Sequence, residues 1–389
     1  MWLRTAGFEL RQLSCHSISQ TGAITISKLF SPLKIRGETL PNRVAYSPMC
    51  QYSCDTDGVV NSWHMVHLGS KATGGTGLVM AEATAVRPDG RISPGDQGLW
   101  SDAQVDALRP VTAFISSQGS VPAVQIAHAG RKGSRSQPWR GSGLLGEDEG
   151  GWQVVGPSAV PYDEKSGVPA ELSTGEIADI TRAFADAAAR AIDAGYRVIE
   201  LHFAHGYLAC QFMSPISNIR EDEYGGPLEN RCRFALETIA AVRESIPESA
   251  PLLVRISATE YAEGGWDLEQ SVQLSKWMKD AGVDLIDVSS GGNSAAQQIK
   301  LNAAYQVPFS AAIREQVGML TGAVGLITEA EQAESILAAG DADLIFLGRE
   351  LLRNPYWPLY AQARLDGSGD WPDPYIRSAF EGAYTGPGG

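Results

Sequence analysis

Short apolar runs recur along the chain, and between them lie longer stretches in which apolar residues return every three or four positions. Eight runs, most of them rich in Val, Ile and Leu, follow one another in order. They are Arg43–Met49, Gly77–Val86, Val121–His128, Tyr196–Phe203, Leu252–Ala258, Val283–Ser290, Gly322–Ile327 and Ala342–Gly348. Such runs predict buried strands, and the near-continuous apolar character of the later ones is typical of a parallel sheet covered on both faces.

The stretches between the runs predict amphipathic helices. Thr174–Gly195 ends in a glycine, which is a typical helix stop. Its apolar face consists of Ile177, Ile180, Phe184, Ala188 and Ile192. Leu268–Gly282 and Glu329–Gly340 repeat the plan of a helix, a glycine and then an apolar run.

Strands that alternate with helices in this way predict a single-domain α/β fold, the (β/α)8 or TIM barrel. The alternative is an open doubly wound sheet, which would prefer a glycine-rich GxGxxG turn after its first strand, but the sequence there is "SPMCQYS". We expect the barrel over residues 27–380. A Gly- and Pro-rich excursion at 134–172 is too long for an ordinary connection, and such excursions usually build a lid or a subunit contact.

Residues outside the expected barrel are left out of the fold prediction. Residues 1–26 are interpreted as an N-terminal extension, either disordered or a weak targeting segment, and residues 381–389 as a flexible C-terminal tail. No apolar run approaches the ~18 residues of a transmembrane helix, so no membrane partner is expected.

Charge and cysteine content narrow the class of protein. The chain of 389 residues has a formal net charge of −14, and such an acidic surface argues against nucleic-acid binding. Five cysteines at irregular spacings favour free thiols in a reducing compartment. We therefore expect a cytoplasmic protein, with an organellar location as the alternative if residues 1–26 are a transit peptide.

Polar residues gather where the expected strands end, and in a barrel these ends surround one open mouth. Gln125 and Arg255 stand inside apolar runs, where an unpaired amide or guanidinium would be costly. The other residues at these ends are Ser47, Pro48, Met49, Cys50, Gln51, Tyr52, Glu82, Ala83, His128, His202, His205, Tyr207, Gly348 and Arg349. Their coincidence at one end of one barrel, more than any single motif, indicates a functional site.

His202 and His205 are two of only six histidines in the chain. They could be metal ligands, core residues bonded to the backbone, or hydrogen-bond donors aimed at a substrate. The HxxH spacing alone is a weak metal signature, no third ligand stands nearby, and His64 and His67 repeat the spacing away from any expected strand end. No metal site is therefore predicted, and the backbone-bonded pair stays open as the alternative to substrate donors.

The residue types at the strand ends suggest a flavin. Gly325, Gly348 and Arg349, after the last two runs, suit a phosphate group bound by backbone N–H groups, a helix N-terminus and a guanidinium. Gln125 and Arg255 suit a flat ring whose edge carries carbonyl acceptors and gains negative charge on reduction. These features point to FMN; a nicotinamide nucleotide held by the barrel alone fits less well, because the dinucleotide-binding turn is missing.

Several longer motifs resemble the old yellow enzyme family, in its bacterial-type, thermophilic-like or YqjM-like branch. They are "LFSPLKIRGETLPNRVAYSPMCQYS", "QIAHAGRK", "IELHFAHGYLACQFMSPISNIREDEYGGPLENRCRF", "VRISA" and "DLIFLGRELLRNP". The resemblance runs from about Ser27 to about Phe380, and the pattern HxxHGYLxxQFxSPxxNxRxDEYGG is long and specific. The family implies an FMN-dependent oxidoreductase that uses NADPH as reductant.

The resemblance also implies roles for residues at the mouth. Cys50 would lie near the O4/N5 edge of the ring, Gln125 at its pyrimidine edge, and Arg255 near N1 and O2. The full set of cofactor-binding positions that it implies is Ser47, Pro48, Met49, Cys50, Ala83, Gln125, Arg255, Gly325, Gly348 and Arg349.

The same resemblance implies a substrate site. His202 and His205 would donate hydrogen bonds to a substrate carbonyl oxygen, and Tyr207 would be the proton donor. Tyr52 would line the pocket, and Arg377, in "WPDPYIRSAF", would reach a neighbouring subunit's site, which favours a homo-oligomer. The implied reaction is ping-pong reduction of the C=C bond of α,β-unsaturated carbonyl compounds through flavin N5.

Three other functions are weighed. A dienoyl reductase-like flavin enzyme would carry a cluster-type cysteine run and an added nucleotide module, for which the chain is too short. A lyase or aldolase barrel would need a Schiff-base lysine or a metal set, and no lysine lies in the eight runs. Only a turnover assay distinguishes an enzyme from a non-catalytic barrel that holds FMN or a metabolite.

Overall fold

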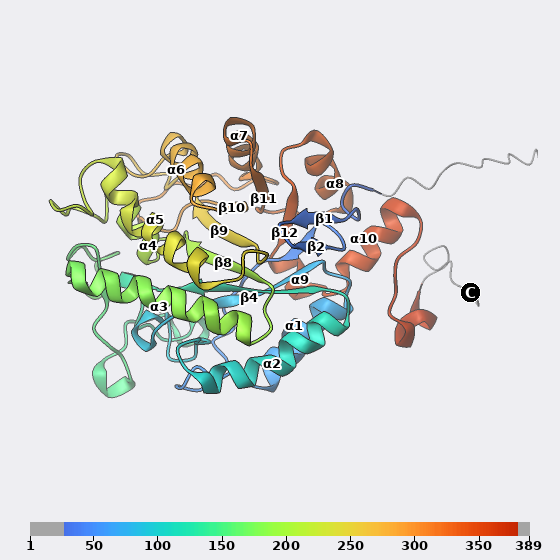
Figure 1. The fold of residues 1–389 in the computed structure, drawn as a ribbon, viewed down its shortest axis with the longest axis horizontal. Helices are drawn as coiled ribbons and strands as arrows, with labels where there is room; N and C mark the ends of the chain where they lie inside the picture. The colour runs from blue at the N-terminus through green and yellow to red at the C-terminus, as the bar shows by residue number, and fades with distance from the viewer. Residues whose placement is uncertain (1–26, 380–389) are drawn as a thin grey trace, which may run out of the picture.

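The computed structural model describes residues 27–379, which contain a closed barrel of eight parallel strands (Figure 1). Around the barrel the strands are β3 (Val44–Tyr46), β4 (Leu78–Ala85), β5 (Val121–Ala127), β8 (Val198–Phe203), β9 (Leu252–Ser257), β10 (Leu285–Ser289), β11 (Leu320–Ala323) and β12 (Leu344–Leu347), which pairs with β3 again. The predicted (β/α)8 barrel is confirmed, and seven of the eight predicted runs contain their strand completely.

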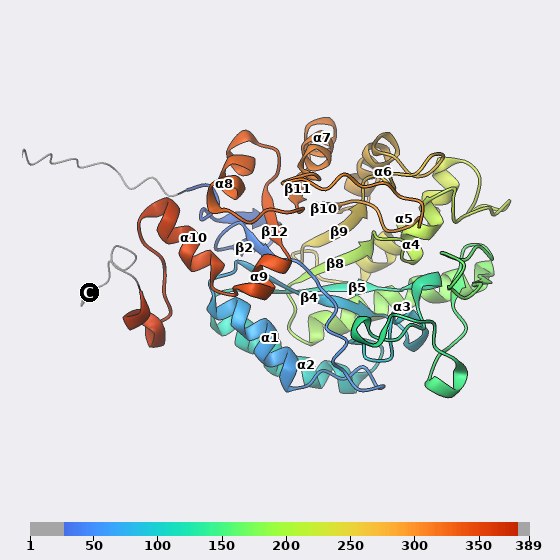
Figure 2. The same ribbon diagram turned by 180° about the vertical axis from the view of Figure 1, so that it is seen from behind.

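A helix that packs on the outside of the barrel follows each strand (Figures 1 and 2). These helices are α1 (Ser62–Thr73), α2 (Asp102–Ser117), α3 (Thr174–Asp193), α5 (Leu228–Ser245), α6 (Leu268–Asp280), α7 (Val307–Val317), α8 (Ala330–Ala339) and α10 (Trp357–Asp366). The three helices predicted from apolar spacing correspond to α3, α6 and α8. In α3, Ser173 and Glu176 form a capping box at the start, and Gly195, at φ +92°, follows the end.

The prediction for the seventh strand is wrong at both ends, because β11 spans Leu320–Ala323 and not Gly322–Ile327. Gly322 lies inside the strand, where the ring of Phe346 covers it so closely that a Cβ atom would lie 2.4 Å from that ring. Beyond the strand, Gly325 has a φ of +125° and Leu326 a φ of +53°, so the chain turns there. Because a glycine lies inside the strand and apolar residues continue beyond it, the apolar pattern does not predict the true boundaries of β11.

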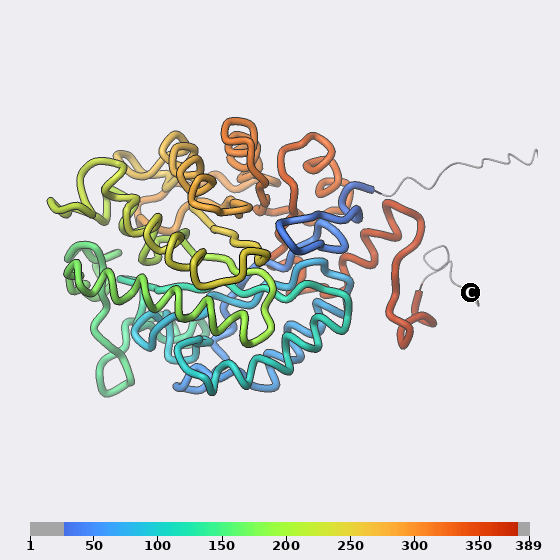
Figure 3. Tube along the Cα trace, viewed as in Figure 1, coloured from blue at the N-terminus to red at the C-terminus, as the bar shows by residue number. Residues whose placement is uncertain are grey.

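A hairpin that the sequence did not reveal closes the amino-terminal end of the barrel. Its strands are β1 (Leu33–Ile35) and β2 (Glu38–Leu40), and it lies against the barrel in the dark blue part of Figure 3. Leu33, Ile35 and Leu40 pack with inward-facing side chains of the barrel strands, such as Met80 and Leu253. The apolar interior is therefore sealed at this end, and polar side chains are left to the carboxyl-terminal mouth.

The predicted excursion is present as a surface segment between β5 and α3. It contains short 3₁₀ turns η3 (Pro138–Arg140) and η4 (Glu147–Glu149) and a two-stranded parallel pair of β6 (Val155–Gly156) and β7 (Ala170–Glu171). The remaining short elements are η1 (Pro88–Gly90), η2 (Gly130–Lys132), α4 (Leu208–Met213), α9 (Arg349–Arg353) and η5 (Asp373–Ser378).

Two further expectations concern the chain as a whole. Among residues 27–379 no helix is long and apolar enough to cross a membrane. The described cysteines Cys50, Cys54, Cys210 and Cys232 are free thiols, as expected. The interpretations of residues 1–26 and 381–389 fall outside the described residues.

Candidate functional site

Strand register brings the predicted polar residues of the mouth together. His202 on β8 is paired with Arg255 on β9, and Arg255 is paired with Asp287 on β10. On the other side of β8, Glu200 is paired with Gln125 on β5, which in turn is paired with Ala83 on β4. Because all these strands run parallel, their side chains meet at the same level of the barrel.

Gln125 and Arg255 both find the polar partners that their burial demands. Gln125 Nε2 donates to Glu200 Oε1 at 2.8 Å, and Arg255 Nη1 donates to Ser47 Oγ at 3.1 Å. Arg255 Nε also lies 3.1 Å from Asp287 Oδ2, an ion pair by distance that lacks the angle of a hydrogen bond. In this hydrogen bond Gln125 turns its NH₂ group toward Glu200 and its carbonyl oxygen away.

Burial changes the ionisation of the two carboxyl groups in this layer. It raises the pKa of Glu200 to about 8, an increase to which the negative charge of Asp287 adds and which Arg255 and Gln125 oppose. Burial likewise raises the pKa of Asp287 to about 6, against the opposing effect of Arg255. The loss of water favours the neutral acid, and one guanidinium serves both groups.

His202 and His205 lie side by side next to this layer. His202 Nε2 is 3.4 Å from His205 Nδ1, and the two rings meet edge to face at 5.1 Å. Burial lowers the pKa of both imidazoles well below the usual range. The nearby His205 adds to this effect for His202, and Arg255 and Lys132 add to it for both rings. Both are therefore neutral near pH 7, each able to donate one hydrogen bond.

The turn after β8 sets the direction of the His205 side chain. His205 has a φ of +59°, an unusual value for a residue with a side chain. Its N–H donates to Ser257 Oγ at 2.9 Å, and its Nε2 lies 2.8 Å from Ser289 Oγ. Lys132 Nζ donates to the carbonyl oxygens of His205 and Gly292, both at 2.8 Å, which ties the turn to neighbouring loops.

Tyr207 stands beside the histidines at the start of α4. Its ring centre is 5.0 Å from that of His202, and Lys132 Nζ lies 5.4 Å from its ring centre. Burial raises the pKa of Tyr207 well above its usual value, and the nearby Cys50 and Asp96 raise it further. The phenol thus keeps its proton across the neutral range and can serve as a proton donor.

The segment after β3 borders the same mouth. Ser47 and Pro48 are buried, and Met49 and Cys50 are half-buried. Gln51 N–H donates to Glu82 Oε2 at 2.6 Å, which anchors the segment to β4. Burial, with Asp96 and Glu82 nearby, raises the pKa of the Cys50 thiol well above its usual range, while contacts with Tyr52 and the Ala83 backbone oppose this rise.

A hollow of about 290 Å³ lies beyond the ends of β11 and β12. Its lining includes Gly325, Gly348 and Arg349, the three residues predicted to hold a phosphate, together with Arg353 and Tyr305. Because this hollow combines bare glycine backbone with two guanidinium groups, it has the donors that a phosphate monoester needs.

These features fit a bound FMN. The hollow would take the phosphate, and Gln125 and Arg255 would meet the ring at the mouth. His202 Nδ1 is buried and has no hydrogen-bond partner among the described residues, so a polar ligand atom is needed there. Among residues 27–379 no cluster of three or more His, Cys, Asp or Glu side chains could hold a metal.

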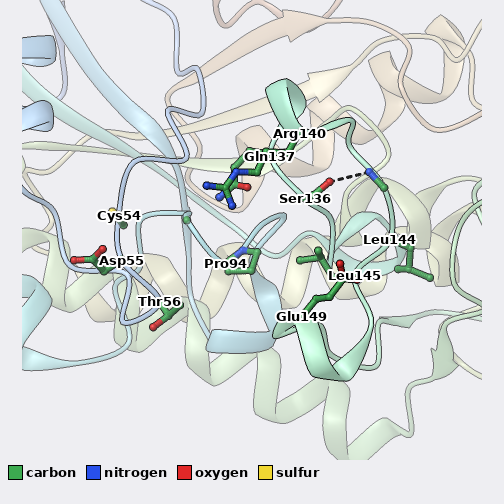
Figure 4. A pocket seen from close by; sticks show the side chains of 12 residues that line it. Cys54, Asp55, Thr56, Pro94, Ser136, Gln137, Arg140, Leu144, Leu145 and Glu149 are labelled. Carbon is green, nitrogen blue, oxygen red and sulfur yellow. Dashed lines mark hydrogen bonds between the residues drawn. The ribbon is translucent and has the colours of Figure 1, made fainter.

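A larger hollow of about 610 Å³ opens beside the mouth (Figure 4). It lies between the segment around Cys54 and Asp55 and the excursion, which contributes Gln137 and Arg140. Tyr52, on the adjoining turn, meets Trp139 of the excursion edge to face at 6.0 Å. The excursion thus forms part of the wall at the entrance to the site.

Arg377 is the one predicted site residue that does not lie near the mouth of the barrel in its own chain. It lies exposed on η5, the red segment near the label C, on the side of the molecule opposite the excursion (Figures 1 and 2). This place is compatible with the expected role in a neighbouring subunit.

The sequence reasoning missed Glu200, Asp287 and Lys132. Glu200 and Asp287 are acidic residues inside two of the quoted apolar runs, the same signal that singled out Gln125 and Arg255. Lys132 lies in the motif "QIAHAGRK" but follows the strand by five positions, where the loop path could not be foreseen.

The barrel, its buried polar mouth and the hollow that suits a phosphate are features of a flavin-binding oxidoreductase of the TIM-barrel type. The family model described as "NADH:flavin oxidoreductase / NADH oxidase family" matches residues 28–367. The chain belongs to this family, the old yellow enzymes, and is an FMN-dependent NADPH dehydrogenase.

Curated relatives are similar over most of their length. An NADPH dehydrogenase of Geobacillus sp. (strain WCH70) is 50% identical over 337 residues, which cover 86% of this chain and 94% of the relative. One of Bacillus licheniformis is 49% identical over 352 residues, which cover 90% and 98%.

Solved structures share the same architecture. Morphinone reductase superposes with a TM-score of 0.73 at 27% identity, covering 91% of this chain and 93% of that one. An old yellow enzyme homologue from Zymomonas mobilis superposes with a TM-score of 0.71 at 26% identity, covering 85% and 91%.

Proposed function

We propose that the protein is an ene-reductase, which reduces the C=C bond of α,β-unsaturated carbonyl compounds and related activated alkenes. The observation that carries this proposal is the neutral pair His202 and His205 beside the protonated Tyr207. Two neutral donors and a phenol suit an acceptor whose oxygen gains negative charge while a neighbouring carbon needs a proton.

In this proposal the cofactor is held by residues from both halves of the barrel. Arg349, with the backbone of Gly325 and Gly348, binds the phosphate, and Arg255 and Gln125 face the edge of the ring. Ser47, Pro48, Met49 and Cys50 line the ring along the segment after β3, and Ala83 lies on the neighbouring strand β4. When bound, FMN accepts a hydride from NADPH and passes it to the acceptor.

The side chains of the mouth prepare the acceptor. His202 and His205 each donate one hydrogen bond to its carbonyl oxygen and stabilise the charge that develops there. Tyr207 holds the proton that the substrate Cα receives, since its pKa keeps it protonated. Tyr52, beside Trp139, limits the shape of acceptor that enters. NADPH and the acceptor use this one mouth in turn, which is a ping-pong order.

The visible spectrum of the purified protein tests this function. The protein should be yellow, NADPH should bleach the flavin absorbance under anaerobic conditions, and cyclohexenone should restore it. Cyclohexanone, which has no C=C bond, is the matched control and should leave the spectrum bleached. A flavin that NADPH bleaches but no activated alkene restores would contradict the ene-reductase assignment and leave a flavin-binding protein with another role.

We also propose that the protein acts as a homo-oligomer in which Arg377 enters a neighbour's substrate site. The exposed position of Arg377 on η5 supports this proposal, because the side chain lies away from the mouth of the barrel in its own chain. Exposed aromatic side chains on the same part of the surface, Tyr360 and Tyr375, would then be covered in the assembly.

A further inference from the structure

The interior of the barrel directly below the flavin site holds three ionisable side chains on adjacent strands. Glu200 on β8, Arg255 on β9 and Asp287 on β10 are 0%, 5% and 0% exposed. Asp287 is the register partner of Arg255, and Glu200 is bound by Gln125, the other residue expected to face the ring. These groups belong neither to the phosphate hollow nor to the substrate donors.

Their charges do not balance when all three are ionised, because one guanidinium stands against two carboxylates. Glu200 Oε2 and both oxygens of Asp287 accept no hydrogen bond from any described residue. The described side chains that bond to or flank this layer are uncharged. They are Ser47 after β3, Gln125 on β5 and the neutral His202 on β8.

A buried negative charge without a donor is expensive, and one added proton removes it. Glu200 is the better place for that proton. Asp287 has Arg255 at 3.1 Å, whereas Glu200 is bonded only to a neutral amide. Burial accordingly raises the pKa of Glu200 to about 8, above the pKa of about 6 for Asp287. Glu200 thus changes its protonation state close to neutral pH.

Reduction of a flavin by hydride adds one negative charge to the ring, at the edge that Arg255 faces. That charge competes with both carboxylates for the same guanidinium. We propose that Glu200, in the molecules in which it is ionised while the flavin is oxidised, takes up a proton from solvent when the flavin is reduced and releases it when the flavin is reoxidised. The buried layer and the flavin together then keep the same net charge through the catalytic cycle.

The step balances. NADPH loses a hydride, which carries two electrons and one proton, and becomes NADP⁺. The hydride forms the N–H bond at flavin N5, and the solvent proton forms the O–H bond on the Glu200 carboxylate. On reoxidation the hydride leaves to the acceptor and Glu200 returns its proton to solvent. The proton that Tyr207 delivers to the substrate is separate from this one.

The proposal rests on the bound FMN and not on which acceptor is reduced, so a redox titration without any alkene tests it. One proton per two electrons lowers a midpoint potential by about 30 mV per pH unit, and two protons by about 59 mV. Between about pH 8 and pH 9, where Glu200 is mainly ionised in the oxidised protein, wild type should follow the steeper slope. Glu200→Gln should follow the shallower one.

A matched control is Asp343→Asn, which alters another buried carboxylate. Asp343 precedes β12 at the amino-terminal end of the barrel and pairs with Arg314 at 2.8 Å, away from the ring. It should keep the slope of wild type. A shallow slope in wild type, or a steep slope that persists in Glu200→Gln, would overturn the proposal, because the second proton would then be absent or bound elsewhere.

A direct measurement covers the case in which Glu200→Gln does not retain FMN. Wild-type protein in weak buffer at about pH 9 is reduced with stoichiometric NADPH in the presence of a pH indicator. About one proton should disappear from solution per flavin, and infrared difference spectra should gain the carbonyl band of a protonated carboxyl group. No proton uptake, or no such band, would refute the assignment whether or not the protein reduces enones.

Discussion

His202 differs from both histidines of the other HxxH pair in what it contacts. His67 Nε2 lies 2.7 Å from Tyr46 Oη, and His64 Nδ1 accepts the N–H of Asn61 at the start of α1. Those two histidines are satisfied by the fold itself. His202 Nδ1 has no partner among the described residues. The spacing is identical in both pairs, so the difference arises from the strand end and not from the motif.

Replacement of both His202 and His205 by Ala should therefore affect acceptor reduction specifically. We expect reoxidation of the flavin by cyclohexenone to slow by about 10²-fold or more, since two oxyanion donors are lost. FMN content and the rate of bleaching by NADPH should change little, which separate stopped-flow experiments on the two half-reactions measure. The control is His67→Gln, which should lower the melting temperature but keep the reoxidation rate per bound flavin. Equal reoxidation rates in the double variant and wild type would remove the proposed role.

Most single residues of the mouth could be predicted from the sequence, but their partners could not. Gln125 and Arg255 were recognised because polar groups inside apolar runs need a partner. That partner depends on which strands are neighbours and on their register, as in the pairing of Gln125 with Glu200 across β5 and β8. A single chain also leaves open what Arg377 contacts, since its expected target lies in another subunit.

At the scale of elements, predictability follows length and periodicity. The strand β4 and the helix α3 are long enough to repeat their apolar pattern and were predicted. The strands β1 and β2 have three residues each, too few to show an alternation. The hairpin was therefore missed, although it closes the end of the barrel opposite the active site.

The hairpin gives a prediction that separates stability from chemistry. Leu40 is fully buried against the amino-terminal ends of the barrel strands, so Leu40→Ala should reduce the free energy of unfolding by about 2–5 kcal/mol. Turnover per bound flavin should stay close to wild type. Leu301→Ala, at a side chain that is 68% exposed, is the size-matched control and should change stability by less than about 0.5 kcal/mol. Denaturant unfolding and steady-state assays measure both, and a large loss of turnover in folded Leu40→Ala would show that the hairpin does more than close the barrel.

For the whole molecule, the pH dependence of stability is the net effect of ionisable groups that act in opposite directions. Burial disfavours the charged form of a side chain, so it lowers the pKa of several histidines and raises the pKa of several carboxyl groups. The histidines are His67, His128, His202 and His205. The carboxyl groups are Asp96, Glu200, Asp284 and Asp287. Because the two sets act in opposite directions between about pH 4 and pH 7, the profile of the wild type alone assigns nothing to one residue.

A comparison of wild type with a variant at one residue isolates the contribution of that residue to the pH dependence of stability. His67 is suitable because it lies outside the proposed site. Burial, with Lys71 and His64 nearby, lowers its pKa to about 3, below the value near 6.5 of the unfolded chain. As the pH falls below about 6.5, the unfolded state binds a proton that the folded state refuses, so wild type loses up to about 1.4 kcal/mol per pH unit from this group. His67→Gln lacks that loss. Its stability deficit relative to wild type should thus be largest at about pH 7 and shrink steadily toward about pH 4.5, as parallel denaturant titrations would measure. A deficit that is constant over this range would mean that the His67 imidazole is protonated equally in both states, and so is not held neutral by the fold.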